Sequence, residues 1–445
     1  MNLLTSPLLT DLYHLNMIQA YLDHGDTSTA VFEFFVRKLP ARRGFLMAAG
    51  LEQVLDFLES LRFSDEEISW LAKTGRFEEN FLEQLATFCF EGDVHAVPEG
   101  RIVFADEPLI RITAPMPQAQ LAETRVMNLI HFQTLIASKA ARIVLAAPGK
   151  VLVDFGLRRA HGAEAGLLAA RASYIAGFSG TATAIAEHEF GIPVFGTMAH
   201  SFVEAFDSET AAFETFARSR PQNLTLLLDT YDTERAAQRV VALAPRLRAQ
   251  GVAIRAVRLD SGNLLTLSRN VRRILDTGGC KDVTVFASGG LDEDAIADLL
   301  KHGAPIDGFG VGTSLTTSSD VPALDCAYKL QEYAGVARRK HSTGKATWPG
   351  RKQIWRRYGP DGHMSGDTLS VDGDSQEGEA LIVPVMRGGK RLATESLADI
   401  RARAARELGR LPAALAQLAP GTAHPVSVAD ALVALAGEAD RAIAG

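Results

Sequence analysis

The chain has 445 residues, of which 47% are hydrophobic and 22% are charged, and 46 Lys and Arg against 53 Asp and Glu give a formal net charge of −7. This length allows two or three domains, and the composition excludes disordered, collagen-like and coiled-coil proteins. The acidic balance disfavours a nucleic-acid partner, because domains that bind nucleic acid usually carry a basic excess.

Cysteine usage and the N-terminus favour a cytoplasmic protein. Cys89, Cys280 and Cys326 lie far apart and form no CxxC pair, so a reducing compartment fits better than a disulfide framework. Residues 1–11 lack the basic region of a signal peptide, and no uncharged apolar run reaches the ~18 residues of a membrane span. We therefore predict a cytoplasmic protein without membrane contact.

Residues 1–130 predict a mixture of helices and strands. Ser6-Pro7 offers an N-cap and a proline at the first helical position, and Ser64-x-x-Glu67 is a capping box for a later helix. Apolar spacing predicts a helix over residues 51–61 and a strand over 30–36. Four prolines between residues 94 and 117 indicate strands near a sheet edge.

From residue 151 onward, buried strands and helices alternate. Apolar runs typical of parallel strands cover residues 151–155, 193–196, 224–228, 254–259, 283–287 and 306–311. Helical segments between them cover residues 163–189, 202–218, 233–250, 263–275 and 293–301. This α/β pattern predicts an irregular barrel slightly better than an open doubly wound sheet, and in both folds ligands bind at the C-terminal ends of the strands.

The alternation stops near residue 333. Residues 341–378 predict loops and short strands, and residues 395–445 predict terminal helices. We divide the chain into an N-terminal α+β segment (1–130), an α/β barrel (131–332) and a C-terminal segment (333–445). A short strand from the last segment could complete the N-terminal domain.

Two glycine-rich loops follow the last two predicted strands. Ser288-Gly289-Gly290 and Gly310-Val311-Gly312-Thr313-Ser314 can place backbone N–H groups against an anion. In barrels the phosphate site lies after the final two strands, so the two loops together favour phosphate binding over simple turns. A third glycine is missing after Gly310-x-Gly312 and no Walker A sequence occurs, which disfavours dinucleotide-binding and P-loop enzymes.

Charged side chains end three other strands. Arg258 and Asp260 lie two residues apart, on one side of a strand, and could hold a carboxylate and a sugar diol or form a structural pair. Arg158 ends an earlier strand. His200 could be a general base, a phosphoryl acceptor or a structural histidine. Metal-site motifs are absent, so any Mg²⁺ is expected to arrive with substrate phosphates rather than on protein side chains.

These motifs, taken in order, resemble nicotinate phosphoribosyltransferases. The matching stretches are Thr10-Asp11-Leu12-Tyr13 and residues 154–159, 196–201, 258–262, 287–290, 310–314 and 340–353. The resemblance implies a seven-stranded, irregular α/β barrel, a second domain built from both chain ends, and a homodimer with sites between subunits. It implies phosphoribosyl transfer from phosphoribosyl pyrophosphate, with Mg²⁺, to nicotinate in NAD biosynthesis, coupled to ATP hydrolysis through a phosphohistidine.

The resemblance also implies roles for single residues. Those around nicotinate are Phe155, Arg158, Thr197, Arg258 and, from the neighbouring subunit, Tyr13. Those around the 5-phosphate are Gly289, Gly290, Gly312 and Thr313. Asp260 would bind ribose hydroxyls, and His200 would be the histidine phosphorylated from ATP.

Other readings differ in the base, the reaction or the presence of catalysis. Relatives that use nicotinamide carry Asp where Ala182 stands here, and an Asp would repel the carboxylate of nicotinate. Quinolinate enzymes are typically shorter chains, and an aldolase would need a Schiff-base lysine that none of the predicted strands ends in. A non-catalytic binding protein stays open. Asn263 departs from the Asp expected after Arg-Leu-Asp-Ser-Gly, which weakens a metal role there.

Overall fold

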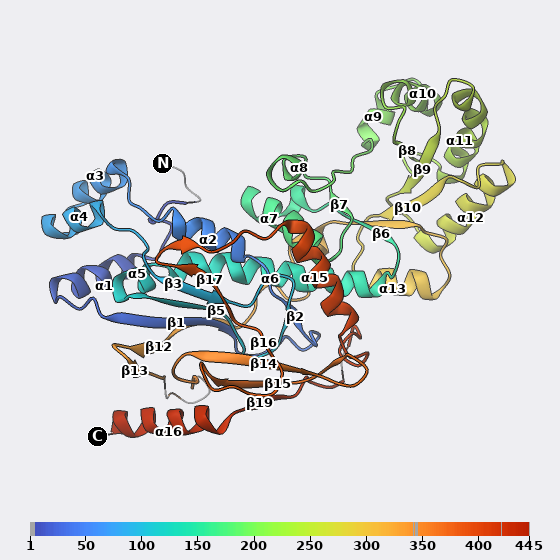
Figure 1. Cartoon of the computed structure of the whole chain (residues 1–445). Coiled ribbons are helices and arrows are strands. Elements are labelled where there is room, and N and C mark those ends of the chain that lie inside the picture. The colour runs from blue at the N-terminus through green and yellow to red at the C-terminus, as the bar shows by residue number, and fades with distance from the viewer. Residues whose placement is uncertain (1–4, 341, 343–345, 420, 445) are drawn as a thin grey trace. The chain divides into compact units, whose positions relative to one another are not determined.

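The computed structural model describes residues 5–340, 342, 346–419 and 421–444, in two compact units (Figure 1). Unit 1 comprises the described residues of Met1–Ser138 and Ala323–Gly445, and unit 2 comprises Lys139–Pro322. His341, Gly344 and Lys345, in the last stretch that resembles the family, lie outside the described residues.

Unit 2 is built on a parallel sheet of six strands in the order β7-β6-β11-β10-β9-β8. The strands are β6 (Val151–Asp154), β7 (Gly180–Thr181), β8 (Leu224–Leu227), β9 (Ile254–Leu259), β10 (Thr284–Ser288) and β11 (Gly308–Val311). The helices are η1 (Leu157–Arg159), α7 (Ala163–Ala176), α8 (Ile185–Phe190), α9 (His200–Glu204), α10 (Glu209–Ser219), α11 (Thr233–Arg248), α12 (Leu264–Thr277), α13 (Glu293–Lys301) and α14 (Thr313–Thr316). Val153, Val257 and Phe309 are fully buried in this sheet, as expected for strands covered on both faces.

Two predicted helices of unit 2 are divided in the structure, and one predicted strand is reduced to a bridge. The helix predicted over residues 163–189 is two helices, α7 and α8, with the strand β7 between them. Residues 193–196 form only a bridge between Val194 and Thr181. The chain crosses so closely here that a Cβ at Gly180 would lie 2.1 Å from the carbonyl oxygen of Pro193. A two-residue strand is too short to show a hydrophobic period, so the sequence pattern missed it.

The parallel sheet forms a half-barrel and not a closed ladder. Among residues 139–322, all of which the structure describes, β7 and β8 are the two edge strands and do not pair with each other. The seven-stranded barrel is therefore not confirmed, although the mixed α/β class is. The helix predicted over 202–218 is likewise divided, into α9 and α10, whereas α13 covers the predicted residues 293–301.

Unit 1 contains three sheets, which both ends of the chain build together. Their strand orders are β13-β12-β1-β5-β3-β17-β18, β16-β14-β15-β19 and β2-β4. The strands are β1 (Thr29–Val36), β2 (Leu46–Met47), β3 (Asp93–Ala96), β4 (Ile102–Val103), β5 (Pro108–Pro115), β12 (Cys326–Tyr333), β13 (Val336–Ala337), β14 (Lys352–Tyr358), β15 (Met364–Val371), β16 (Glu379–Ala380), β17 (Val383–Arg387), β18 (Lys390–Arg391) and β19 (Val426–Val428). Because β12 pairs along its length with β1, residues 323–332 belong to unit 1, where the sequence-based boundary placed them in the barrel segment.

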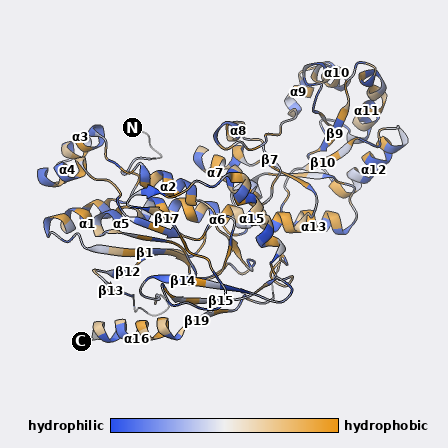
Figure 2. Cartoon of the chain, in the orientation of Figure 1, coloured by the Kyte–Doolittle hydropathy of each residue, from blue (hydrophilic) through white to orange (hydrophobic). Residues whose placement is uncertain are grey.

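The helices of unit 1 come from the same two parts of the chain. They are α1 (Leu12–Asp23), α2 (Leu51–Glu59), α3 (Asp65–Lys73), α4 (Glu79–Ala86), α5 (Met116–Leu121), α6 (Glu123–Ala146, which runs on into unit 2), α15 (Leu397–Gly409) and α16 (Asp430–Ala444). Helix α16 carries hydrophobic and hydrophilic residues side by side along its turns (Figure 2), as a helix with one face on a core does.

Local signals in residues 1–130 predicted some features correctly and others wrongly. The capping box of Ser64 and Glu67 is confirmed. Ser6 does not cap a helix, because α1 begins at Leu12 and the Ser6 hydroxyl instead donates to Glu67. The prolines do not mark a sheet edge: β5 lies between β1 and β3, and Pro108 and Pro115 are its first and last residues. Proline at a strand end costs no interior hydrogen bond.

Helix α6 is long and apolar enough, by length and composition, to cross a membrane. In the structure 72% of its most apolar window is buried. The hydroxyls of Thr134 and Ser138 accept hydrogen bonds from the backbone N–H groups of Ala49 (3.2 Å) and Met47 (2.9 Å). These contacts identify α6 as a core helix of a folded protein.

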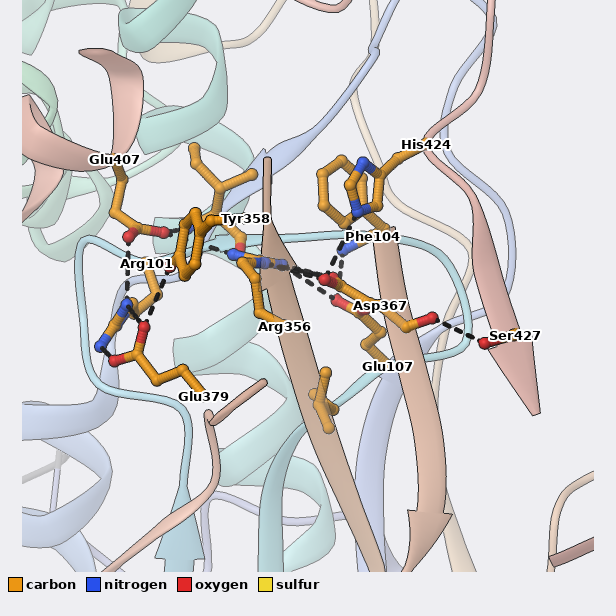
Figure 3. A network of polar contacts seen from close by, with 12 residues as sticks. Arg101, Phe104, Glu107, Arg356, Tyr358, Asp367, Glu379, Glu407, His424 and Ser427 are labelled. Carbon is orange, nitrogen blue, oxygen red and sulfur yellow. Dashed lines mark hydrogen bonds and ion pairs between the residues drawn. The ribbon is translucent and has the colours of Figure 1, made fainter. Parts of the chain in front are cut away.

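A buried network of charges joins the four-stranded sheet to the rest of unit 1 (Figure 3). Arg356 on β14 lies opposite Asp367 on β15, and its Nη2 is 2.6 Å from Asp367 Oδ2. Its Nη1 lies 3.3 Å from Glu407 Oε2, which belongs to α15. Arg101 extends the network by contacting Glu407 at 3.1 Å and pairing with Glu379. Arg356, Asp367 and Glu407 are almost completely buried.

Candidate active site

Most of the predicted site residues of unit 2 gather at the C-terminal ends of its parallel strands. Phe155 follows β6, Arg258 lies near the end of β9 with Asp260 just after it, Ser288 ends β10, and Gly312 follows β11. Backbone N–H groups and loop side chains converge at this edge of a parallel sheet, which is where α/β proteins bind ligands.

Arg258 is held in one position by three side chains. Its Nε donates to Ser288 Oγ at 2.9 Å, its Nη1 to Thr197 Oγ1 at 3.2 Å, and its Nη2 to Asp260 Oδ1 at 2.8 Å. The guanidinium carbon lies 5.2 Å from the centre of the Phe155 ring. A fixed guanidinium beside an aromatic face suits a flat, anionic ligand, because it can pair with a carboxylate while the ring stacks.

Asp260 is an ionised acceptor at this edge. Burial alone would raise its pKa, but the hydrogen bond from Ser288 and the charge of Arg258 together lower the pKa below its usual value. Its second oxygen, Oδ2, lies 3.8 Å from His200 Nε2. Asp260 can therefore accept hydrogen bonds from sugar hydroxyls and stabilise nearby positive charge.

His200 begins α9 and points its two nitrogens at different partners. Nδ1 lies 3.1 Å from Thr230 Oγ1, and Nε2 lies 3.8 Å from Asp260 and 4.0 Å from Asp229 Oδ1. The side chain is 39% exposed, so a ligand can reach it. An imidazole oriented between two carboxylates can exchange protons or act as a nucleophile.

Asp229 and Thr230 belong to this cluster, although the sequence analysis did not propose them. The Asp229 side chain is 3% exposed, and its Oδ2 accepts hydrogen bonds from the backbone N–H of Asp260 (3.2 Å) and from Ser261 Oγ. Its Oδ1 is buried, with no hydrogen-bond partner among the described residues. Asp229 comes two positions after Leu227, the last residue of β8. Its place at the end of a buried strand is the signal that could have found it.

The glycine loops lie at the same edge, and their backbone geometry favours glycine. Gly289 has φ +97°, and a Cβ there would lie 2.0 Å from the carbonyl oxygen of Asp260. Gly290 also has positive φ, at +65°. At Gly312 a Cβ would lie 3.2 Å from the carbonyl oxygen of Phe155. Thr313 is exposed and accepts a hydrogen bond from Arg159 Nη1 at 3.2 Å.

Two predicted residues make none of the hydrogen bonds described for this cluster. Arg158 is exposed on η1 and takes no part in the hydrogen bonds around Arg258. Tyr13 belongs to unit 1, where it is 48% exposed on α1.

Two positions that bear on specificity and metal binding have structural contacts of their own. Asn263 caps α12, because its side chain accepts a hydrogen bond from the backbone N–H of Thr266 at 3.0 Å. Ala182 is exposed after β7, and its N–H donates to the carbonyl oxygen of Asp154.

Asp154 is the buried carboxylate beneath the edge. It accepts hydrogen bonds from Thr181 Oγ1 and the backbone N–H of Gly156, each at 2.8 Å. Burial raises its pKa, and these two donors partly oppose the rise. Among the described residues, no group of three or more His, Cys, Asp or Glu is arranged to hold a metal ion.

Family models match the chain over both of its main parts. Residues 8–131 match the nicotinate phosphoribosyltransferase (NAPRTase) N-terminal domain, and residues 151–348 match the nicotinate phosphoribosyltransferase (NAPRTase) family. The chain is 50% identical over 429 residues to nicotinate phosphoribosyltransferase pncB2 of Mycobacterium tuberculosis. The alignment covers 96% of this chain and 92% of that protein. The chain belongs to the nicotinate phosphoribosyltransferase family.

Further relatives of the nicotinate phosphoribosyltransferase family agree in sequence and in structure. Nicotinate phosphoribosyltransferase of Bacillus subtilis is 39% identical over 372 residues, covering 82% of this chain and 76% of that protein. The crystal structure of human nicotinic acid phosphoribosyltransferase superposes with a TM-score of 0.87 at 28% identity, covering 96% of this chain and 99% of that one. The matched ranges include every predicted site residue, Tyr13 among them.

Proposed function

We propose that the protein transfers the phosphoribosyl group of phosphoribosyl pyrophosphate to nicotinate, giving nicotinate mononucleotide and pyrophosphate in NAD biosynthesis. The observation that carries the proposal is Arg258, fixed by Ser288, Thr197 and Asp260 beside the ring of Phe155. The guanidinium matches the nicotinate carboxylate and Phe155 matches its ring. We assign Arg158 to the nicotinate base because of the family resemblance. It lies on η1, in the turn that follows β6.

The remaining groups suit the sugar phosphate. Breaking the bond between C1 and pyrophosphate develops positive charge on the ribose, and an ionised Asp260 that accepts bonds from the ribose hydroxyls stabilises that charge. Gly289, Gly290, Gly312 and Thr313 offer backbone N–H groups to the 5-phosphate. Mg²⁺ enters as part of the phosphoribosyl pyrophosphate substrate and neutralises the leaving pyrophosphate.

The role proposed for His200 is to accept a phosphoryl group from ATP and so couple hydrolysis to synthesis. Three features support it: the ring is part-exposed, Nδ1 contacts Thr230, and Nε2 faces Asp229 and Asp260. Carboxylates on that side can hold the imidazole in the orientation a nucleophile needs. Phosphorylation would bring new negative charge beside these carboxylates, which could transmit the state of the histidine to the ribose site.

The finer architecture is part of the same proposal. Residues 193–196 would complete a seven-stranded barrel between β7 and β8, an idea that the bridge between Val194 and Thr181 supports. The enzyme would act in the cytoplasm as a homodimer, with Tyr13 of the neighbouring subunit covering the nicotinate ring. The exposure of Tyr13 in a single chain is consistent with that use.

The decisive experiment is formation of mononucleotide, measured by chromatography. The purified protein receives phosphoribosyl pyrophosphate and Mg²⁺ with nicotinate, nicotinamide or quinolinate, each with and without ATP. We expect product from nicotinate alone, in amounts that ATP increases. Product from another base would overturn the assignment of the substrate, and no product from any base would favour a binding protein.

A single variant tests the energy coupling. His200→Ala should lose the stimulation by ATP and the incorporation of labelled γ-phosphate, while some phosphoribosyl transfer survives, because the contacts to nicotinate and ribose remain. Phe202→Leu, two positions further along α9, serves as a control for folding of this helix. Stimulation by ATP that persists in His200→Ala would contradict the phosphohistidine role.

A further inference from the structure

A second cluster of charges lies in unit 2, outside the site described above. Lys139 Nζ lies 2.5 Å from Glu293 Oε2 and 2.8 Å from Asp320 Oδ1, and Arg142 Nε lies 3.0 Å from Glu293 Oε1. The side chains of Lys139, Arg142 and Glu293 are only 1–3% exposed, and that of Asp320 is 19% exposed. Both cations project from α6, and the reaction proposed above uses none of the four groups.

The two carboxylates lie just beyond the two glycine loops. Glu293 is the first residue of α13 and comes three positions after Gly290. Asp320 follows the short helix α14, which begins at Thr313. One ammonium group therefore contacts the segments that follow both loops. The loops also contact each other directly, because Ser314 Oγ donates to the carbonyl oxygen of Leu291.

Backbone geometry shows how closely these loops are fitted. Gly289 packs so tightly on Asp260 that a Cβ would approach its carbonyl oxygen to 2.0 Å. Between α14 and Asp320, Ser318 is buried with φ +42°, a conformation that L-residues adopt only where their surroundings impose it. A shift of either loop would therefore disturb the other and the backbone of Asp260.

We infer that Lys139 is a positioning residue for the ribose phosphate, and that its ammonium group holds the two glycine loops in the spacing that a phosphate requires. The inference rests on the proposed binding of the 5-phosphate by these loops. An anion site built from backbone N–H groups has no flexible side chain that could adjust to a displaced phosphate. The positions of its donors therefore depend on the contacts that fix the loops.

Stability alone accounts poorly for this cluster. Burying two cations and the carboxylate of Glu293 costs desolvation that roughly cancels their attraction, so an apolar substitute of the same size would often serve as well. The particular advantage of Lys139 is geometric. Its single ammonium group contacts Glu293 and Asp320, and so fixes the distance between the two segments that carry them. Arg142 donates a hydrogen bond to Glu293 Oε1, and Lys139 forms an ion pair with Oε2.

The test compares two buried lysines. Lys139→Met keeps the length of the side chain and removes the charge, and Lys139→Arg restores a cation. The matched control is Lys352→Met, because Lys352 in unit 1 is equally buried and pairs with Glu33 at 2.8 Å. For each protein we would measure the KM for phosphoribosyl pyrophosphate, the KM for nicotinate, kcat and Tm.

We expect Lys139→Met to raise the KM for phosphoribosyl pyrophosphate about tenfold and to change the KM for nicotinate less than about threefold. Lys139→Arg should recover at least part of the loss. Lys352→Met should lower Tm to a similar degree and leave the KM for phosphoribosyl pyrophosphate unchanged. Equal rises in both KM values, or the same KM change in both lysine variants, would overturn the inference.

Two further variants keep the inference open to test if Lys139→Met does not fold. Asp320→Ala removes one of the two contacts of the ammonium group, and a KM for phosphoribosyl pyrophosphate equal to that of the wild type would count against the inference. Gly289→Ala tests the loops themselves, because a Cβ there would lie 2.0 Å from the carbonyl oxygen of Asp260 and must displace the loop. If Gly289→Ala raises that KM and the Lys139 and Asp320 variants do not, positioning by Lys139 is wrong and the proposed function stands. If none of them raises it, the assignment of the loops to phosphate is wrong, and the inference falls with it.

Discussion

Two arginine–aspartate pairs, one in each unit, use the same chemistry for different ends. Arg356 and Asp367 in unit 1 are completely buried and linked to further carboxylates (Figure 3). Arg258 and Asp260 in unit 2 are 15% and 30% exposed, at the end of a strand beside the part-exposed His200. The first pair joins two strands and a helix, whereas the second has an open side that a ligand can reach.

The comparison shows why an arginine and an aspartate in a sequence do not by themselves identify a site. Burial of Arg356 leaves its charge only a structural use, because no ligand can approach it. Arg258 is fixed by three protein partners and still borders solvent. A fixed cation with an open side is the arrangement that binding requires.

The sharpest way to break this comparison is to replace both arginines by leucine. Arg356→Leu leaves Asp367 and Glu407 as uncompensated buried carboxylates and should lower the free energy of unfolding by about 3–5 kcal/mol. Arg258→Leu should cost ~1 kcal/mol of stability but lower kcat/KM for nicotinate roughly 100-fold or more, because the carboxylate loses its partner. Chemical denaturation measures the free energy of unfolding of both variants, and steady-state kinetics measures their kcat/KM for nicotinate. Loss of stability without loss of activity in Arg258→Leu would make its pair structural as well.

Adding a charge at the open edge should change specificity and leave the fold intact. Ala182 is exposed, so Ala182→Asp should keep the Tm of the wild type. The new carboxylate would repel nicotinate and lower its kcat/KM about tenfold or more. Ala182→Asn, which has the same shape without the charge, is the control. Equal activity of the Asp and Asn variants would place the nicotinate carboxylate elsewhere.

The buried network should respond to pH in a way that the open edge does not. Burial and the neighbouring Asp367 raise the pKa of Glu107 well above its usual value. The contact with His424 and the hydrogen bonds from Arg356 outweigh burial and lower the pKa of Asp367. A raised folded pKa contributes stability that is present below the unfolded pKa of Glu and is lost as pH rises through the folded pKa. The depressed pKa of Asp367 contributes stability that is lost only at acidic pH.

Glu107→Gln removes the cost of ionising that carboxyl group. The stability of the variant relative to the wild type should therefore rise between pH 5 and pH 9, by on the order of 1 kcal/mol. Asp260→Asn is the control from the open edge: the lowered pKa of Asp260 places its titration below this range, so its relative stability should stay flat. Thermal unfolding at several pH values measures both. A flat profile for Glu107→Gln would mean that Glu107 is ionised in the folded protein.

The smallest effect is expected at Asn263, which departs from the Asp of the family pattern and has a structural role as a helix cap. Asn263 caps α12, and Asn and Asp cap helices about equally well. Asn263→Asp should change the free energy of unfolding by less than ~0.5 kcal/mol and leave the dependence of the rate on Mg²⁺ unchanged. A lower requirement for Mg²⁺ in the variant would show that this position contacts the metal–pyrophosphate complex.

Long periodic segments of the chain were predictable from the sequence, and short or non-local ones were not. The helix at residues 293–301 and the strand at 254–259 have strong local patterns, and the structure has them at those residues. The two-residue strand β7 has no pattern of its own and exists because Gly180 lets the chain pass Pro193. The capping box of Ser64 is a local signal and was correct, whereas the Ser6 hydroxyl turned to Glu67, 61 residues away.

The residues of the candidate site also divide into those with a local sequence signal and those without one. The residues that end strands or form glycine loops, such as Arg258, Asp260 and Gly289, were found because position on a parallel strand fixes which edge a residue reaches. Asp229 and Thr230 were missed, since their importance lies in contacts with His200, 29 and 30 residues away. Lys139 carried no signal, because its two partners come from segments more than 150 residues distant.

The sequence by itself determined the α/β class, the edge of the sheet at which the candidate site lies and the family, because hydrophobic period and ordered motifs are properties of the chain. Only the tertiary structure decided which charges are buried and which stay open. Burial depends on what packs from other parts of the chain: β12 and β17 enter the same sheet as β1 and β3, and Glu407 reaches Arg356 from a distant helix. That packing separates the arginine that holds the fold from the arginine available to a substrate.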